Sequence, residues 1–352
     1  MVPSLWSAPA LFAGLAIASA CRPAFGDAKF KTIVTFGDSY TDENRLGYFI
    51  SNKGAAPPAG WQQPVGLATA SGGRSWARYA SYYSNATLYN YAVSGAVCSN
   101  KVTPRYFSAI NASFPDIAGY EVPAYLADAN YVSPNGTKFF TGKPSNTVYA
   151  IWIGTNDLGN GAFLTDSQLP GKTVADYTDC VYDQITRLYE HGARYFVLMN
   201  LAPLALLPQY QAPDQDGLQS TQYFPDAPGK NLSQVHGRMQ NTVAALNQQY
   251  QFRTPYLSMT KTWKHATVVN FDVNALMTDM YRHPATYFNG TAPPNVKGVV
   301  HLCNEQGKNC TTASSPDSYM WYDPLHPSEQ TSRIVAREFV SVLNGKSKWA
   351  SC

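Results

Sequence analysis

The sequence predicts an α/β fold, a three-layer α/β/α arrangement around a doubly wound sheet of about five parallel strands. Five short apolar runs recur along the chain, at residues 31–36, 88–93, 147–153, 194–199 and 266–271. Near-continuous apolar runs of this length are typical of parallel strands that are buried on both faces. Each run leads into Gly, Ser, Asn or Asp, and the intervening segments are long enough for right-handed crossover helices.

Helices are predicted most clearly at 174–191, 241–251 and 329–343, the first because it ends in His191 and Gly192, a common helix stop. The longest irregular stretches are 51–75, 208–233 and 284–320, and loops of this length usually form functional rims or lids. The chain contains no internal repeat and no low-complexity linker. We therefore expect a single domain over residues 21–352.

The composition favours a packed globular protein and limits its partners. Hydrophobic residues make up 45% and charged residues 14% of the chain, which permits a large core and argues against disorder. The net charge is +3, and no run of basic residues favours a nucleic-acid or anionic membrane partner. The histidines and cysteines lack the short spacings of zinc or redox sites, so we expect no metal and no cofactor.

The N-terminus and the sequons predict export. Residues 5–20 are apolar and end in Ala18-Ser19-Ala20, the pattern of a secretory signal peptide cleaved after Ala20. A membrane anchor is the alternative, but a span needs about 20 residues and this run is shorter. Six N-x-S/T sequons are candidate glycosylation sites on an extracellular protein: Asn85, Asn111, Asn135, Asn231, Asn289 and Asn309.

The cysteines suit the oxidising compartment that a signal peptide implies. Six are present: Cys21, Cys98, Cys180, Cys303, Cys310 and Cys352. Cys303 and Cys310 lie in one loop, HLCNEQGKNC, and form the disulfide that we predict. Six cysteines allow about 15 pairings, and the sequence leaves the others open.

Three predicted strands deliver chemically useful residues. The first runs into Gly37-Asp38-Ser39, where a Ser on a strand-to-helix turn is exposed and the next helix N-terminus can stabilise negative charge. The second runs into Ser94-Gly95, where Gly permits a close approach of the backbone N–H. The third runs into Gly154-Thr155-Asn156, whose side-chain amide can donate to an oxyanion. Taken singly, the first segment is more simply explained as a helix cap, the second equally well as an ordinary turn, and the third alternatively as an Asx turn that caps the next helix.

A fourth segment, Asp323-Pro324-Leu325-His326, lies near the C-terminus. Its spacing allows the carboxylate to reach the imidazole Nδ1–H on the same loop and so to fix the tautomer of a catalytic base. The carboxyl ends of parallel strands meet at one edge of the sheet. The four segments together therefore supply a nucleophile, a base with its orienting carboxylate, and donors for an oxyanion.

These segments, in this order, resemble blocks I, II, III and V of the SGNH (GDSL-type) hydrolase superfamily, which has a flavodoxin-like fold. The resemblance implies that Ser39 is the nucleophile, His326 the base and Asp323 its orienting group. It also implies an oxyanion hole made of the Ser39 N–H, the Gly95 N–H and the Asn156 amide. The stretches TFGDSYTDE, LYNYAVSGAVCSN, VYAIWIGTNDLG and MWYDPLHPSEQ are similar to fungal acetylesterases of carbohydrate esterase family 16.

The resemblance implies a monomeric, secreted serine esterase that removes acetyl groups from carbohydrates, its partner being a small acetylated saccharide. Tyr40 and Trp152 flank two of the blocks, and we expect them to limit the space for longer acyl chains. One departure is residues 42–45, which read Asp-Glu-Asn-Arg where many members have a Gly-Asn pair. This departure bears on substrate specificity.

Alternative functions keep part of this pattern. A lipase or lysophospholipase would use the same residues on longer acyl esters, and a silent carbohydrate-binding protein would use only the fold. A carboxylate pair for glycoside hydrolysis could be drawn from Asp38, Asp42 and Asp157, although a carboxylate beside each block is more simply a structural hydrogen-bonding group.

Overall fold

The computed structural model describes residues 25–26 and 28–352; the predicted signal peptide (1–20) and Cys21 lie outside them. Within this range a six-stranded sheet forms the centre of the molecule, in the order β12-β7-β6-β5-β1-β2. Its strands are β1 Thr32–Gly37, β2 Thr87–Asn90, β5 Thr147–Trp152, β6 Tyr195–Met199, β7 Thr267–Phe271 and β12 Ala350–Ser351.

The first five of these strands are parallel to one another, and β12 pairs antiparallel with β7. The predicted α/β class and all five predicted strands are therefore confirmed, and the order of the parallel strands is that of a flavodoxin-like sheet. The prediction for the second strand extends too far, because β2 ends at Asn90. The edge strand β12 is missed because two residues, Ala350–Ser351, give no apolar run.

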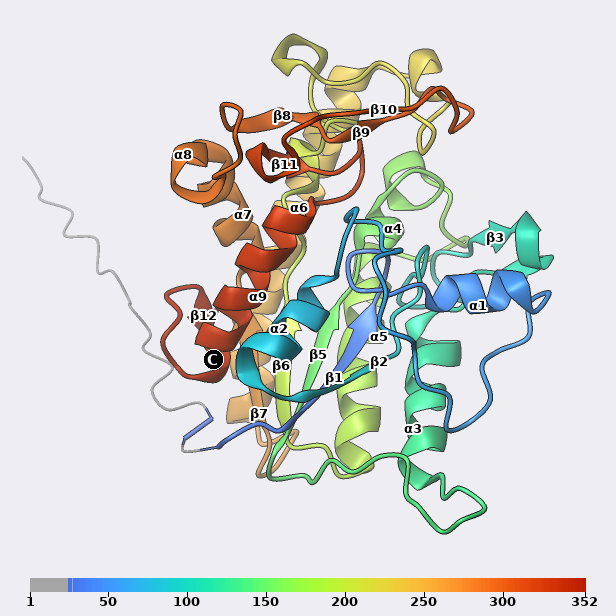
Figure 1. Cartoon of the computed structure of the whole chain (residues 1–352), viewed down its shortest axis with the longest axis vertical. Coiled ribbons are helices and arrows are strands. Elements are labelled where there is room, and N and C mark those ends of the chain that lie inside the picture. Colours follow the sequence, from blue (N-terminus) through green and yellow to red (C-terminus); the bar gives the residue numbers. More distant parts are fainter. Residues whose placement is uncertain (1–24, 27) are drawn as a thin grey trace, which may run out of the picture.

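The helices are arranged in two layers, one on each face of the sheet (Figure 1). The described residues form α1 Arg45–Ser51, α2 Trp76–Ser84, α3 Val122–Asn130, α4 Thr155–Leu158, α5 Val174–Glu190, α6 Leu232–Met259, α7 Val273–Arg282, α8 Pro284–Tyr287 and α9 Glu329–Leu343. The predictions for α5 and α9 are confirmed. The prediction of 241–251 covers only the middle of α6, because Gly237 and Pro255 lower its apparent helix propensity. No described helix has the length and apolar character that a bilayer span requires.

Aromatic contacts define the two faces. On one face Trp76 of α2 packs between Trp152 of β5 and Phe339 of α9, with ring centroids 6.1 and 4.9 Å apart. On the other face Tyr125 of α3 packs against Tyr149 of β5 at 5.4 Å. Since Tyr149 and Trp152 point to opposite sides of one strand, both faces of the sheet are covered. This explains why the strands read as continuous apolar runs.

Short strands outside the main sheet lie in its connecting loops: β3 Tyr106–Phe107, β4 Ala112–Ser113, β8 Asn295–Val299, β9 His301–Leu302, β10 Thr311–Thr312 and β11 Tyr319–Trp321. The prediction that 284–320 is irregular is wrong, because α8, β8, β9 and β10 lie within it. The parallel pairing of β8 with β11 brings this segment next to the chain that leads into the Asp323–His326 loop.

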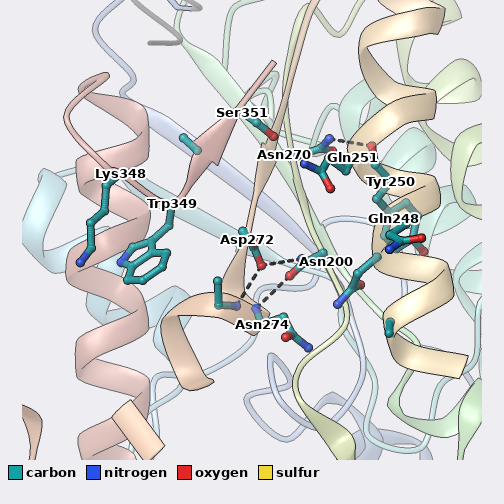
Figure 2. A pocket seen from close by; sticks show the side chains of 14 residues that line it. Asn200, Gln248, Tyr250, Gln251, Asn270, Asp272, Asn274, Lys348, Trp349 and Ser351 are labelled. Atoms are coloured by element: carbon teal, nitrogen blue, oxygen red, sulfur yellow. Dashed lines mark hydrogen bonds between the residues drawn. The ribbon is translucent and has the colours of Figure 1, made fainter. Parts of the chain in front are cut away.

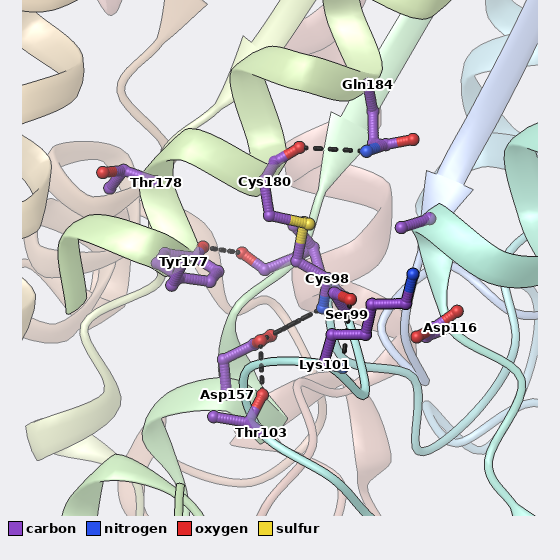
Figure 3. Close-up of a disulfide and its surroundings, with 12 residues drawn as sticks. Cys98, Ser99, Lys101, Thr103, Asp116, Asp157, Tyr177, Thr178, Cys180 and Gln184 are labelled. Carbon is purple, nitrogen blue, oxygen red and sulfur yellow. Dashed lines mark hydrogen bonds between the residues drawn. A yellow bond between two sulfur atoms is a disulfide. The ribbon is translucent and has the colours of Figure 1, made fainter. Parts of the chain in front are cut away.

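Two disulfides join described residues. Cys303 and Cys310 are bonded as predicted, across a sequence separation of 7 residues. Cys98 is bonded to Cys180 of α5 across a separation of 82 residues (Figure 3). Cys352 is disulfide-bonded as well. The Cys98–Cys180 bond ties the loop after β2, which carries Gly95, to the helix layer.

Removing Cys98–Cys180 will destabilise the protein more than removing Cys303–Cys310. Chain entropy predicts losses of about 4.5 and about 2.4 kcal/mol for loops of these two lengths. Guanidinium unfolding of the two double Cys→Ser variants measures the difference. Equal losses, or a larger loss for Cys303→Ser/Cys310→Ser, would contradict the chain-entropy account.

Candidate active site

Ser39 lies in a tight turn at the carboxyl end of β1 and is 8% exposed. Asp38 shapes this turn: its carbonyl accepts the Thr41 and Asp42 N–H groups, both at 2.9 Å, and its Oδ1 accepts the Tyr40 N–H at 3.0 Å. The prediction that a helix starts directly after Ser39 is wrong, because α1 begins only at Arg45. Ser39 therefore owes its position to the turn and not to a helix N-terminus.

The structure brings Ser39 together with the loop that carries Asp323 and His326. The Nε2 atom of His326 lies 2.9 Å from the Ser39 Oγ. Its Nδ1 atom lies 2.9 Å from both Asp323 carboxylate oxygens. Asp323 and His326 are 4% and 5% exposed. Residues from opposite ends of the chain thus form a continuous hydrogen-bonded row.

The Asp323–His326 loop is held by its own backbone and by the β1 turn. Asp323 Oδ1 accepts the backbone N–H groups of Leu325 and His326, at 2.8 and 2.9 Å. The Tyr322 N–H donates to the His326 carbonyl at 2.8 Å, which closes the loop. The Tyr40 hydroxyl donates to the Leu325 carbonyl at 2.8 Å. Tyr40, which follows Ser39, therefore holds Leu325, which precedes His326.

Tyr223 is a site residue that the sequence analysis missed. Its hydroxyl donates to Asp323 Oδ2 at 2.7 Å, and its ring meets the His326 ring edge to face at 5.3 Å. It belongs to the predicted long loop 208–233, whose length was the one signal that it borders a site. Burial and the adjacent Asp323 charge raise the pKa of the Tyr223 hydroxyl, so it stays a donor.

Gly95 and Asn156 lie at the same edge of the sheet. Gly95 has φ +85, and a Cβ there would come within 2.3 Å of the Phe114 ring, so only glycine fits. Within the described chain, the N–H groups of Ser39 and Gly95 donate to no protein acceptor. Asn156, in the α4 turn after β5, donates one amide hydrogen to the Ala96 carbonyl at 2.8 Å. That bond orients its side chain beside Gly95.

Buried carboxylates connect the loops that carry these groups. Asp42 accepts the backbone N–H and the hydroxyl of Ser94, both at 2.8 Å. Asp157 accepts the Cys98 N–H at 3.1 Å and the Thr103 hydroxyl at 2.9 Å (Figure 3). Asp42 therefore joins the loop after β1 to the loop after β2, and Asp157 joins the loop after β2 to the α4 turn after β5.

Glu121 adds a further connection and was also missed, because no local pattern marks it. Its Oε2 accepts the Gly37 N–H at 2.8 Å and its Oε1 accepts the Val93 N–H at 3.2 Å. The side chain thus ties the end of β1 to the segment that precedes Gly95.

These positions do not fit glycoside hydrolysis. Asp38, Asp42 and Asp157 are at most 1% exposed, so they cannot flank a sugar ring in solvent. Burial raises the pKa of Asp38 to about 6 and that of Asp157 to about 7. Burial also raises the pKa of Asp42 and of Glu121. The three aspartates have the structural role that the sequence analysis favours.

Residues 42–45, which depart from the family pattern, are part of the same framework. Glu43 forms a buried ion pair with Arg78 of α2, with nitrogen–oxygen distances of 2.8 and 2.9 Å. Arg45 donates to the Asn90 carbonyl at 2.9 Å, and its guanidinium lies 5.0 Å from the centre of the Trp61 ring. This segment therefore connects the loop after β1 to α2 and to the end of β2.

Tyr40 and Trp152 are 4% and 3% exposed, and their rings pack on each other at 5.2 Å. Both side chains belong to the buried core, and their role in limiting the space for longer acyl chains stays a prediction. Phe114 lies next to Gly95: it is half-buried, and its ring stacks on Phe107 at 4.5 Å.

One cluster has metal-ligand atoms close together in the described chain, formed by His301, Cys303 and Cys310. Its two sulfurs form the disulfide, which removes the thiolates that a metal would need.

The comparison with known protein families agrees with this geometry. Residues 33–339 match the model of the GDSL-like lipase/acylhydrolase family. The chain belongs to this family. This GDSL-like acylhydrolase is 36% identical to an acetylesterase of Hypocrea jecorina over 92% of its own chain and 91% of the relative. An acetylesterase of Thermothelomyces thermophilus is 27% identical over 52% of this chain and 57% of the relative. The protein is therefore a carboxylic ester hydrolase.

The free energy of unfolding of this hydrolase will fall as the pH rises from about 4 to about 7, because buried carboxyl groups lose their protons over this range. The folded-state pKa of Asp157, raised by burial to about 7, exceeds the ordinary value of 3.8. The folded state therefore binds more protons between these values, and stability falls as they are released. Asp157→Asn keeps the acceptor oxygen and will flatten this slope in urea unfolding measured across the range.

Asp176→Asn is the matched control, because the pKa of Asp176 is lowered in the folded state whereas that of Asp157 is raised. The Lys172 ammonium lowers the pKa of Asp176 to about 2, so the stability it contributes is lost only as the pH falls below about 4. A slope between pH 4 and pH 7 that Asp157→Asn leaves unchanged would contradict the prediction.

Proposed function

We propose that this GDSL-like hydrolase is a secreted serine esterase that removes acetyl groups from short carbohydrates. The observation that carries the mechanism is the row Ser39 Oγ–His326 Nε2 at 2.9 Å and His326 Nδ1–Asp323 at 2.9 Å. This is the geometry of a nucleophile, a base and the group that orients the base. The 36% identity to a fungal acetylesterase supports the choice of acyl group.

In the first step His326 Nε2 accepts the Ser39 proton while the Ser39 Oγ attacks the ester carbonyl carbon. The carbonyl oxygen becomes an oxyanion, which the Ser39 N–H, the Gly95 N–H and the free amide hydrogen of Asn156 receive. Donors that are fixed before the reaction stabilise this charge without reorganisation. In the tetrahedral intermediate the bond between the carbonyl carbon and the sugar oxygen then breaks, His326 returns the proton to that oxygen as it leaves, and acetyl-Ser39 remains.

In the second step water attacks the acetyl carbonyl carbon while His326 accepts its proton. The second tetrahedral intermediate collapses, acetate leaves, and the proton returns to the Ser39 Oγ. Asp323 stabilises the imidazolium in both steps and stays ionised. Tyr223 donates to the same carboxylate and closes one side of the imidazole.

Two features support a short acyl group and a polar alcohol. The Phe114 ring beside Gly95 narrows the space next to the oxyanion donors. The long loops 51–75 and 208–233 are rich in Pro, Gly, Asn and Gln, which suits a hydrated sugar better than a lipid surface. A lipase that acts on longer chains is the rival within the same chemistry, and the assay on esters of increasing chain length described below separates the two.

We propose export in a glycosylated, disulfide-bonded and monomeric form, as a single domain over residues 21–352. The side chains of all six sequon asparagines are exposed, which glycosylation requires. The disulfides Cys98–Cys180 and Cys303–Cys310 suit an oxidising compartment.

Ser39→Ala will abolish turnover of p-nitrophenyl acetate and covalent labelling by a fluorophosphonate, because both need the Oγ nucleophile. The loss of kcat will be about 10³-fold or more, with the unfolding midpoint nearly unchanged. A variant that keeps more than about one-tenth of the wild-type kcat would refute the nucleophile assignment. Labelling of the wild type also excludes a silent binding protein.

Hydrolysis of p-nitrophenyl esters will fall steeply beyond about four acyl carbons, since each methylene that the pocket excludes costs about 1–3 kcal/mol. Phe114→Ala will raise the rate on octanoate relative to acetate. Phe252→Ala, at an exposed position on α6, is the control with an unchanged ratio. Faster turnover of octanoate than acetate by the wild type would favour the lipase.

The carbohydrate assignment is tested separately by acetate release from acetylated xylo-oligosaccharides and from intact xylan. We expect rapid release from the oligosaccharides and little from the polymer. No release from any acetylated saccharide, with p-nitrophenyl acetate still hydrolysed, would refute the substrate class but not the mechanism.

A further inference from the structure

A second pocket, of about 430 Å³, lies at the β7–β12 edge of the sheet, between α6 and the C-terminal segment 348–351 (Figure 2). Its volume is within the range of small-ligand sites. The strand β12 has only two residues, so beside it the sheet edge is left open against α6. No residue of the mechanism proposed above lines this pocket.

The walls of the pocket are fixed by hydrogen bonds to the backbone. Asn247 donates to the Leu201 carbonyl at 3.0 Å, and Asn270 donates to the Tyr250 carbonyl at 2.7 Å. Asn200 donates to Asp272 Oδ1 at 2.7 Å, a contact that Figure 2 shows at the centre of the pocket. Since these amides already have partners, they set the shape of the pocket before any ligand arrives.

Other polar groups at the pocket have no such partner. Within the described part of the chain, Asp272 Oδ2, the Trp349 indole N–H and the side-chain amides of Gln248 and Gln251 make no hydrogen bond to protein, although all line the pocket. Figure 2 places Trp349 and Asp272 on one side and Gln248 and Gln251 on the other. A flat indole, a carboxylate oxygen and amides that both donate and accept match the apolar faces and the hydroxyls of a sugar ring.

The outer face of α6 continues this surface. A shallower hollow there is lined by Gln248, Phe252 and Tyr256, and Gln248 also lines the 430 Å³ pocket. Phe252 and Tyr256 are 69% and 58% exposed, unusually high for large aromatic side chains. Two adjoining hollows with aromatic side chains make a track longer than one sugar unit.

We propose that this track, from Trp349 across Gln248 to Tyr256, is a non-catalytic binding site for a neutral saccharide chain. Two cations border the track: Lys348, whose Nζ lies 4.4 Å from the centre of the Trp349 ring, and Arg253, which is ion-paired with Asp179. The pocket therefore carries Asp272 without an excess of positive charge, and this favours a neutral chain over an acidic one.

The track is separate from the proposed catalytic site. Asn200 and Asp272 follow β6 and β7, whereas Ser39 follows β1 at the same edge of the sheet. β7 and β1 are three strand positions apart, or about 14 Å across the sheet, and β6 and β1 are two positions apart, or about 10 Å. A saccharide held in the track therefore leaves Ser39 open to its substrate, and the site would keep the enzyme on a polymer from which other hydrolases release its short substrates.

The test is affinity electrophoresis of the Ser39→Ala protein in native gels that contain arabinoxylan, glucomannan or hydroxyethylcellulose. We expect retardation by at least one of these polymers. Trp349→Ala and Gln248→Ala/Gln251→Ala, each in this background, will weaken the apparent affinity by about tenfold or more, the scale of a lost central contact. Tyr82→Ala, which removes a 52% exposed aromatic residue of α2, is the matched control and will be retarded like its parent.

In the wild-type background the same track variants will hydrolyse p-nitrophenyl acetate at the normal rate, which shows that they are folded and that the site is distinct from Ser39. The proposal is overturned if no polymer retards the parent protein, or if the Gln248→Ala/Gln251→Ala protein is retarded like its parent. A loss of retardation confined to Trp349→Ala would also overturn it, because the proposed track needs Gln248 and Gln251 as well. None of these outcomes depends on whether Ser39 acts on acetylated sugars.

Discussion

Backbone N–H groups donated across loops to buried carboxylates hold the catalytic edge of this molecule in one geometry. Asp42 receives the Ser94 N–H, Asp157 receives the Cys98 N–H, and Glu121 receives the N–H groups of both Gly37 and Val93. Each of these contacts joins two loops that parallel strands would otherwise only bring near each other. The positions of Ser39, Gly95 and Asn156 relative to one another depend on these bonds.

The burial of these carboxylates has a cost in the free energy of folding. Carboxylates that are removed from water are destabilised, and the raised pKa values of Asp38 and Asp157 express that cost. In the proposed mechanism, the N–H groups of Ser39 and Gly95 are in place before the substrate binds, so no reorganisation is needed when an oxyanion forms. The buried ion pair of Glu43 with Arg78 and the Cys98–Cys180 bond stiffen the same loops from outside.

Local patterns predicted the groups of the proposed mechanism, and they missed the groups that hold them in place. The five parallel strands, α5, α9 and the pairing of Ser39 with Asp323 and His326 follow from apolar runs and short motifs. Tyr223, Glu121 and Phe114 lack such signals, because each gains its role only from a partner elsewhere in the chain. The sequence does not show the burial of Tyr40 and Trp152 for the same reason: adjacency to a motif does not tell whether a side chain points to the substrate or to the core.

The sequence by itself determined the fold class, the family and the candidate residues of the proposed mechanism, because these are encoded in contiguous residues. Only the tertiary structure decided the 2.9 Å contact between Ser39 and His326, the side of the sheet that each aromatic residue covers, and the pocket beside β12. Such features depend on the packing of segments that are up to 287 residues apart, and no local periodicity records that packing.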